Sequence, residues 1–458
     1  MAASATLVLR REELARRVEA LPDELAGWRK RSRDELDMNA HFSQIQALEI
    51  LIGALVAKQR RLLDDLDSEG EPEGFRVTAF ELVQEIIKTQ GIWDFFRGKL
   101  ELRFSPDFKS DLWVADTVAW DCYRPVMDRA VAAGALSAAL VREPPLTYLT
   151  AEFSPATWVR GSRPNDGRDY HLGIARLPIP VIEIPWDHMG NLWELVSLHH
   201  EVGHDIEADL KLRPELLASL QTALAAAGVP DERVKIWLSW EGEIFADLVG
   251  LQQGGPAFAH GLMHLILLPA AMVAAYDPAD PHPTHYARIL LNAAYIRELV
   301  PGSDSLAAQA DALETAWKAQ YGDMASFQPF LSDAPHVFRA LMETPLPVLN
   351  GKKVRDLMPF TAADDIRIQA ARDYLLTGMN APAPLSIPPR HCVSAARLAA
   401  TAVAQEATPA PGAERMATLS KINERLLQLV QDNAVPGLRA GDMAAPHKQF
   451  IAGFAELI

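Results

Sequence analysis

The N-terminal part of the chain carries its apolar residues at the spacing of amphipathic helices. Residues 11–67 are rich in charge, and leucines such as Leu48, Leu51 and Leu55 recur three or four positions apart. This spacing puts apolar side chains on one face of a helix, so the segment predicts an antiparallel pair of helices. The acidic segment 64–74, which contains proline and glycine, indicates a solvated connection to a further helix.

The pattern changes near the middle of the chain. Residues 143–168 are rich in proline, glycine, threonine and aromatic residues, and the short segments 170–176 and 180–184 have the composition of strands. Helical spacing then resumes over 191–320 and again after Ser332. The sequence therefore predicts a mainly α protein with a small β-sheet, in the α+β class.

Prolines bracket the second predicted strand at both of its ends. Proline is tolerated at the ends of strands and at the edges of sheets, which favours an edge strand here. The open side of an edge strand can pair with the main chain of an extended peptide. We therefore expect a substrate-binding edge strand formed by Val181, Ile182, Glu183 and Ile184.

The changes in pattern also divide the chain into three regions. A length of 458 residues is enough for two or three domains. We expect a helical N-terminal region over 1–139, a central domain that contains the sheet over 140–330, and a helical C-terminal region over 331–458. The uncharged segment 257–276 is as long as a minimal membrane span, but a buried helix has the same composition, and we favour the buried helix.

Composition narrows the possible functions. Hydrophobic residues make up 49% and charged residues 23% of the chain, as in ordinary soluble globular proteins. The 60 acidic residues outnumber the 44 basic ones, and the net charge of −16 argues against a nucleic-acid partner. Two cysteines are too few for a disulfide framework or a thiolate zinc site, so a metal would be held by histidine and carboxylate. The N-terminus lacks the apolar run of a signal peptide, and we expect a cytoplasmic protein without a membrane partner, its oligomeric state left open.

The strongest chemical signal is the segment HHEVGH, in which His200, Glu201 and His204 form the pattern H-E-x-x-H. The local sequence is helical, and positions four apart share one face of a helix, so both imidazoles can bind the same ion. Glu201 stands next to them, where a carboxylate can act on a metal-activated water. This arrangement predicts a hydrolytic zinc site.

Catalytic zinc usually takes three protein ligands and leaves one position for water. The best candidates for the third ligand are Glu241 and Glu243 in the segment WEGEIFAD. Only Glu243 has an acid four residues later, Asp247, which would share its helical face and could hold the second ring nitrogen of a ligand histidine. We therefore predict a zinc ion (Zn2+) held by His200, His204 and Glu243, with Asp247 behind them.

With HEVGH followed by EIFAD, the sequence resembles the gluzincin class of zinc metallopeptidases, in which H-E-x-x-H on one helix is completed by the Glu of an E-x-x-x-D motif on a later helix. The segment HPTHYAR is similar to the H-P-x-x-x-x-R element of the CAAX prenyl endopeptidases and their mitochondrial relatives, and the neprilysin family has a similar His and Arg. The resemblance covers roughly residues 180–288. It implies that the central domain is a zincin-like metallopeptidase core flanked by helical regions.

The resemblance also implies roles for the residues of the later motif. His282 would stabilise the oxyanion, with His285 as the alternative, and Arg288 would organise the site. With Glu201 as the general base, the chain would be a zinc-dependent peptidase acting on a peptide or protein substrate in extended form. The alternative is a non-catalytic helical scaffold or regulatory binding protein that retains the fold and binds no zinc.

Overall fold

The structure is a computed structural model, and it describes residues 5–34, 38, 40–67, 71–140, 143–162, 177–378, 386–405, 412–434 and 445–456. These residues form a mainly α-helical protein with one small sheet, which confirms the fold class predicted from the sequence. The α-helices are α1 (Ala5–Asp34), α3 (Phe42–Asp64), α4 (Pro72–Glu101), α5 (Lys109–Ala132), α6 (Leu198–Asp209), α7 (Arg213–Ala226), α8 (Asp231–Ser239), α9 (Glu241–Gly254), α10 (Pro256–Leu265), α11 (Ala270–Val273), α12 (His285–Leu299), α13 (Asp304–Tyr321), α14 (Gln328–Phe338), α15 (Val354–Leu357), α16 (Ala362–Thr377), α17 (Pro389–Ala404), α18 (Gly412–Asn433) and α19 (Ala445–Gly453).

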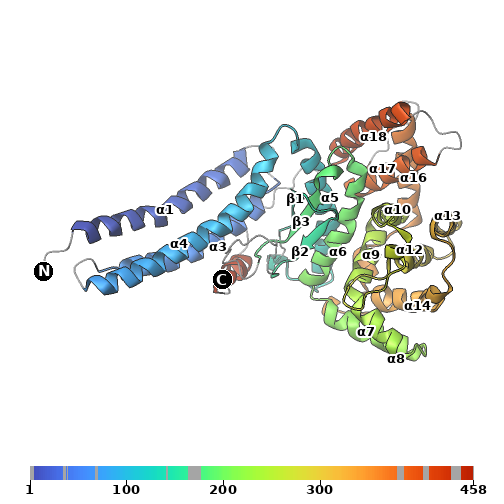
Figure 1. Ribbon diagram of the computed structural model, residues 1–458, viewed down its shortest axis with the longest axis horizontal. Helices are drawn as coiled ribbons and strands as arrows, with labels where there is room; N and C mark the ends of the chain where they lie inside the picture. The colour runs from blue at the N-terminus through green and yellow to red at the C-terminus, as the bar shows by residue number, and fades with distance from the viewer. Residues whose placement is uncertain are drawn as a thin grey trace.

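The first three helices form an arm that projects from the rest of the molecule (Figure 1). The pair predicted over 11–67 corresponds to α1 and α3, and α4 packs against both of them. Buried leucine, isoleucine and aromatic side chains from the three helices form a core of their own, which α19 joins from the far end of the chain. The arm therefore depends on residues near both ends of the sequence.

The sheet has three strands, β1 (Leu146–Thr150), β2 (Ala156–Trp158) and β3 (Val181–Pro185). Their order is β1-β3-β2, and β3 pairs with β1 in parallel and with β2 antiparallel. The other predicted strand, 170–176, lies outside the described residues.

The prediction of an edge strand at Val181, Ile182, Glu183 and Ile184 is wrong, because these residues form most of the central strand: all four pair with β1, and the first three also pair with β2. All of them are buried. The prolines misled the prediction because they stand at the ends of the strand, where they remove no hydrogen bond from the ladders between them. Such a position is as compatible with a central strand as with an edge.

The sheet separates the core of the arm from a larger core. Successive side chains of a strand point to opposite faces, and accordingly Val181 joins the core of the arm while Ile182 and Ile184 join the larger core. The larger core contains α5, α6, α9, α12 and α16 to α18, so all three of the predicted regions 1–139, 140–330 and 331–458 contribute to it. The boundaries between these regions remain a prediction.

The uncharged segment 257–276 is not one continuous helix. Its first part lies in α10 and is largely buried, as expected for a helix of the core. Its second part contains only the short α11, and Leu267, Met272 and Tyr276 are exposed there. Among the described residues, every helix is too short or too polar to span a bilayer.

Candidate metal centre

Two closely packed helices carry the predicted zinc ligands. Helix α6 contains the H-E-x-x-H motif, and α9 packs against it. A Cβ atom built on Gly203 of α6 would lie 3.0 Å from the Cα atom of Ala246 and 3.1 Å from the Cβ atom of Val249, both on α9. The absence of a side chain at Gly203 therefore allows the two helices to come close enough for their ligands to meet.

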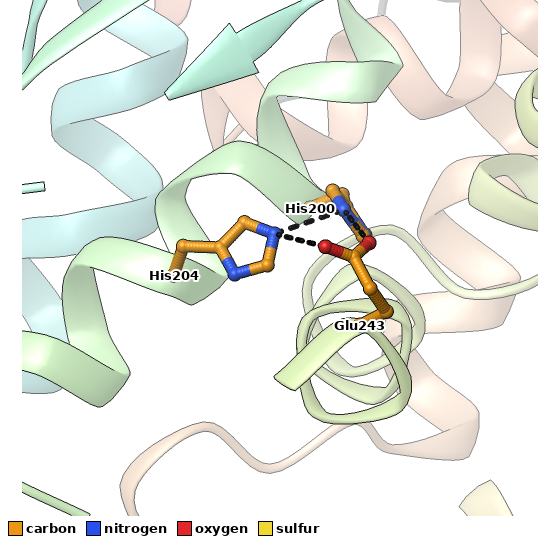
Figure 2. A group of neighbouring side chains, drawn as sticks. All are labelled: His200, His204 and Glu243. Atoms are coloured by element: carbon orange, nitrogen blue, oxygen red, sulfur yellow. Dashed lines mark hydrogen bonds and ion pairs between the residues drawn. The ribbon is translucent and has the colours of Figure 1, made fainter. Parts of the chain in front are cut away.

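His200 and His204 from α6 and Glu243 from α9 converge on one place (Figure 2). The two Nε2 atoms are 3.2 Å apart, and Glu243 oxygens lie 3.3 Å from Nε2 of His200 and 3.5 Å from Nε2 of His204. Around a tetrahedral zinc ion with bonds of about 2.0–2.1 Å, neighbouring donor atoms are about 3.3 Å apart. Two imidazoles and a carboxylate are also a donor set that zinc uses in hydrolases. The three side chains therefore fit the ion that the sequence predicts.

Asp247 and Arg288 lie directly behind the ligands. Asp247 is completely buried, and its Oδ1 atom is 2.9 Å from Nδ1 of His200, which leaves Nε2 directed at the ligand cluster. It accepts hydrogen bonds of 2.7 and 2.8 Å from the guanidinium of Arg288 and one of 3.0 Å from Asn292. The guanidinium also reaches Glu243, at 3.4 Å. Arg288 thus holds both carboxylates of the E-x-x-x-D motif in place.

The charges around the ligand cluster favour a cation. Burial alone lowers the pKa of a histidine, but at His200 the carboxylates of Asp247 and Glu243 outweigh it and raise the pKa to about 10. At His204, burial and the neighbouring His200 lower the pKa to about 4. Burial would raise the pKa of Glu243, yet the two histidines and Arg288 hold it well below its usual range. Glu243 is therefore a carboxylate, the form in which it can bind a metal.

Glu201 and His282 face the same cleft as the ligands. Burial raises the pKa of Glu201 to about 7, which suits a group that takes up and releases a proton near neutral pH. His282 is partly exposed, and its Nε2 atom lies 3.2 Å from Glu243 while its Nδ1 atom lies 2.7 Å from Asp280. His285, the alternative to His282, is the first residue of α12 and is not among the residues that line the cleft.

The cleft has an open part and an enclosed part that meet at the ligand cluster. The open part runs between α6 and the segment that contains β2, and Ala156 and Thr157 of β2 line it. Because β2 pairs with β3 on one side only, it is the edge strand that lies beside the candidate site. Its three residues are too few to show a strand pattern, so sequence reasoning missed it.

The enclosed part of the cleft lies on the other side of His200 and Glu201. Its walls are mainly apolar and include Val196, Phe258 and Leu262. The ring of Phe258 is stacked parallel to the imidazole of His200, with centroids 6.1 Å apart. This part of the cleft comes from helices that the sequence analysis treated only as core.

Two further carboxylates near the ligands were not predicted to belong to the site. Glu207 lies three residues after His204 on α6 and lines the open part of the cleft. Glu241, rejected above as a ligand, lies against it, and burial together with the charge of Glu207 raises the pKa of Glu241 to about 8. The sequence did hold a signal for Glu207: it follows His204 by three positions, and positions three apart share a face of a helix.

In comparisons with known proteins, no protein-family model, no curated protein and no solved structure matches the chain. The function must therefore be argued from the geometry of the site, since a fold class alone supports many activities.

Proposed function

We propose that this protein is a zinc-dependent peptidase. One observation carries the proposal: His200, His204 and Glu243 each bring a donor atom to one place, within 4.8 Å of one another, although Glu243 is distant from the histidines in sequence. These atoms are a donor set that a tetrahedral zinc ion can draw together. The cluster opens onto a cleft, and Glu201 and His282 line that cleft beside it. A cluster that only stabilised the fold would not need a cleft through which a substrate can reach it.

A zinc ion bound by His200, His204 and Glu243 would supply Lewis acidity, which polarises a carbonyl group and lowers the pKa of water toward neutrality. Glu201 acts as the general base, taking a proton from the attacking water and passing it to the amine that leaves when the C–N bond breaks. His282 donates a hydrogen bond to the oxygen of the carbonyl group as negative charge develops on it. Asp247 and Arg288 position the ligands through their contacts with His200 and Glu243.

The substrate in this proposal is a peptide or protein segment in extended form. Strand β2 replaces the segment 181–184 as the docking strand, because β3 has no open side and β2 borders the cleft. An extended segment laid along β2 would gain main-chain hydrogen bonds and would pass over the ligand cluster.

We also assign the protein to the cytoplasm. Both cysteines, Cys122 and Cys392, are buried free thiols. Burial raises the pKa of each thiol, so neither is an activated nucleophile. Unpaired thiols are typical of a reducing compartment.

The test compares the parent protein with a Glu201→Gln variant, by metal analysis and by cleavage of a peptide library followed by mass spectrometry. We expect the parent to carry about one zinc ion per chain and to cleave peptides. The variant should keep its zinc and lose about 100-fold or more of the activity, because only the base is removed. A Glu232→Gln variant, altered on the exposed surface of α8, is the control and should match the parent. A parent that has no zinc, and no activity after zinc is added, contradicts the proposal and favours the scaffold.

A further inference from the structure

A pair of acidic side chains lies two or three positions along the chain from the candidate metal ligands. Glu207 follows His204 by three positions on α6, and Glu241 precedes Glu243 by two positions at the start of α9. Because α6 and α9 run side by side, the two carboxyl groups lie against each other. Glu207 lines the open part of the cleft, so the pair lies beside the path proposed for the substrate.

The two carboxyl groups are buried, and apart from a hydrogen bond that they share they have few partners among the described residues. Glu207 is 7% exposed, and its Oε1 atom has no hydrogen-bond partner among the described residues, although the side chain lines the cleft. Glu241 is completely buried, and neither of its oxygens accepts a hydrogen bond from the described part of the chain. Leaving buried carboxyl oxygens without donors is costly, so a ligand that brings donors to them is favoured.

The chain itself shows which donor fits this place. The guanidinium of Arg213, at the start of α7, lies over the two carboxyl groups, with its Nε atom 3.7 Å from Glu241, too far for a hydrogen bond. Its Nη1 atom is 3.1 Å from the position that a Cβ atom on Gly242 would take, so the glycine leaves room for it. The Arg213 side chain is 56% exposed and its ion pair is loose. Such a pair is weak, and a substrate can displace it at little cost.

We propose that Glu207 and Glu241 form a subsite that binds the arginine or lysine side chain of a substrate, which takes the place of the Arg213 guanidinium. A guanidinium can donate several hydrogen bonds in one plane to neighbouring carboxyl oxygens, so arginine should be preferred. This inference rests on the proposed peptidase function and adds the substrate class: peptides with a basic residue next to the bond that is cleaved.

The test uses pairs of peptides that differ only in having arginine or its neutral isostere citrulline at one position. Binding to the zinc-loaded Glu201→Gln variant is measured by fluorescence anisotropy, so that no cleavage is needed. We expect the arginine peptide to bind about 10- to 100-fold more tightly, as for hydrogen bonds between charged groups. Adding Glu207→Gln should abolish most of this ratio, and adding the control Glu232→Gln should leave it unchanged.

A second variant avoids any change to the buried pair. Arg213→Ala removes the competing guanidinium from a largely exposed position, and it should increase the affinity for arginine peptides while leaving that for citrulline peptides nearly unchanged. Equal binding of arginine and citrulline peptides, or no peptide binding at all, overturns the subsite. Selective binding without cleavage by the parent supports the subsite and contradicts the peptidase, so the two proposals fail separately.

Discussion

Gly203 offers a sharp test of how the fold positions the candidate ligands. In the Gly203→Ala variant the new Cβ atom would meet Ala246 at 3.0 Å and Val249 at 3.1 Å, whereas carbon atoms in contact normally lie about 3.5–4.0 Å apart. The contacts are to the backbone and Cβ atoms of α9, which cannot rotate away. Helices α6 and α9 must therefore separate by about 0.5 Å to restore normal contacts.

The separation matters more for metal binding than for stability. Overpacking lowers the free energy of unfolding by about 1–3 kcal/mol, and replacing a helical glycine by alanine raises it by about 1 kcal/mol. The net loss in the free energy of unfolding is therefore about 0–2 kcal/mol. Zinc ligands, however, must lie within about 0.2 Å of their preferred distances. Pulling the helices back together would cost about 1–2 kcal/mol of binding free energy, and we expect zinc affinity to fall about 5- to 30-fold.

The assay is competition for zinc against a chromophoric chelator, with thermal unfolding of the metal-free protein measured in parallel. Gly53→Ala in α3 is the matched control, because a Cβ atom there would meet nothing within 4 Å. It should gain about 1 kcal/mol in stability and keep the zinc affinity of the parent. Unchanged zinc affinity in Gly203→Ala would refute the idea that close packing of α6 and α9 sets the distances between the ligands.

Three further predictions concern the ligand network and the buried charges. Asp247→Asn should weaken zinc binding about 10- to 100-fold, because it loosens the hold on His200, and an unchanged dissociation constant would count against that role. Zinc at about 100 times its dissociation constant should stabilise the parent by about 2.7 kcal/mol. A denaturation midpoint that is the same with and without zinc would contradict the proposal that the folded protein binds the ion. Burial would raise the pKa of Glu143, but Arg160 and His447 outweigh it and lower the pKa below its usual value. The stability that Glu143 gains from them is therefore present above about pH 5 and lost as the pH falls further, and unfolding curves across this range should show the loss. Equal stability at pH 3 and pH 6 would argue against it.

Local patterns in the sequence were sufficient to predict the helical fold and the convergence of the candidate ligands. The spacing of His200 and His204 follows from the period of a single helix, and the choice of Glu243 over Glu241 depended on Asp247 four residues later. The structure places Asp247 against His200, as that argument requires. Binding of zinc itself remains a proposal.

The place of each strand in the sheet could not be predicted in the same way. Whether the segment 181–184 is an edge or a centre depends on which other strands pair with it, and those partners are distant in the sequence. Strand β2 is three residues long, and a segment of that length has no periodicity to detect. The contact of Arg213 with Glu241 likewise depends on how α7 packs beside α9. Such contacts are tertiary and leave no local signal.

The most direct test of the account is to locate zinc in a crystal of the zinc-loaded protein by anomalous scattering at the zinc absorption edge. We expect one strong peak, about 2.0–2.2 Å from Nε2 of His200, Nε2 of His204 and a carboxyl oxygen of Glu243. A crystal that contains zinc but shows no peak between these three side chains, or shows its strongest peak elsewhere, would contradict it.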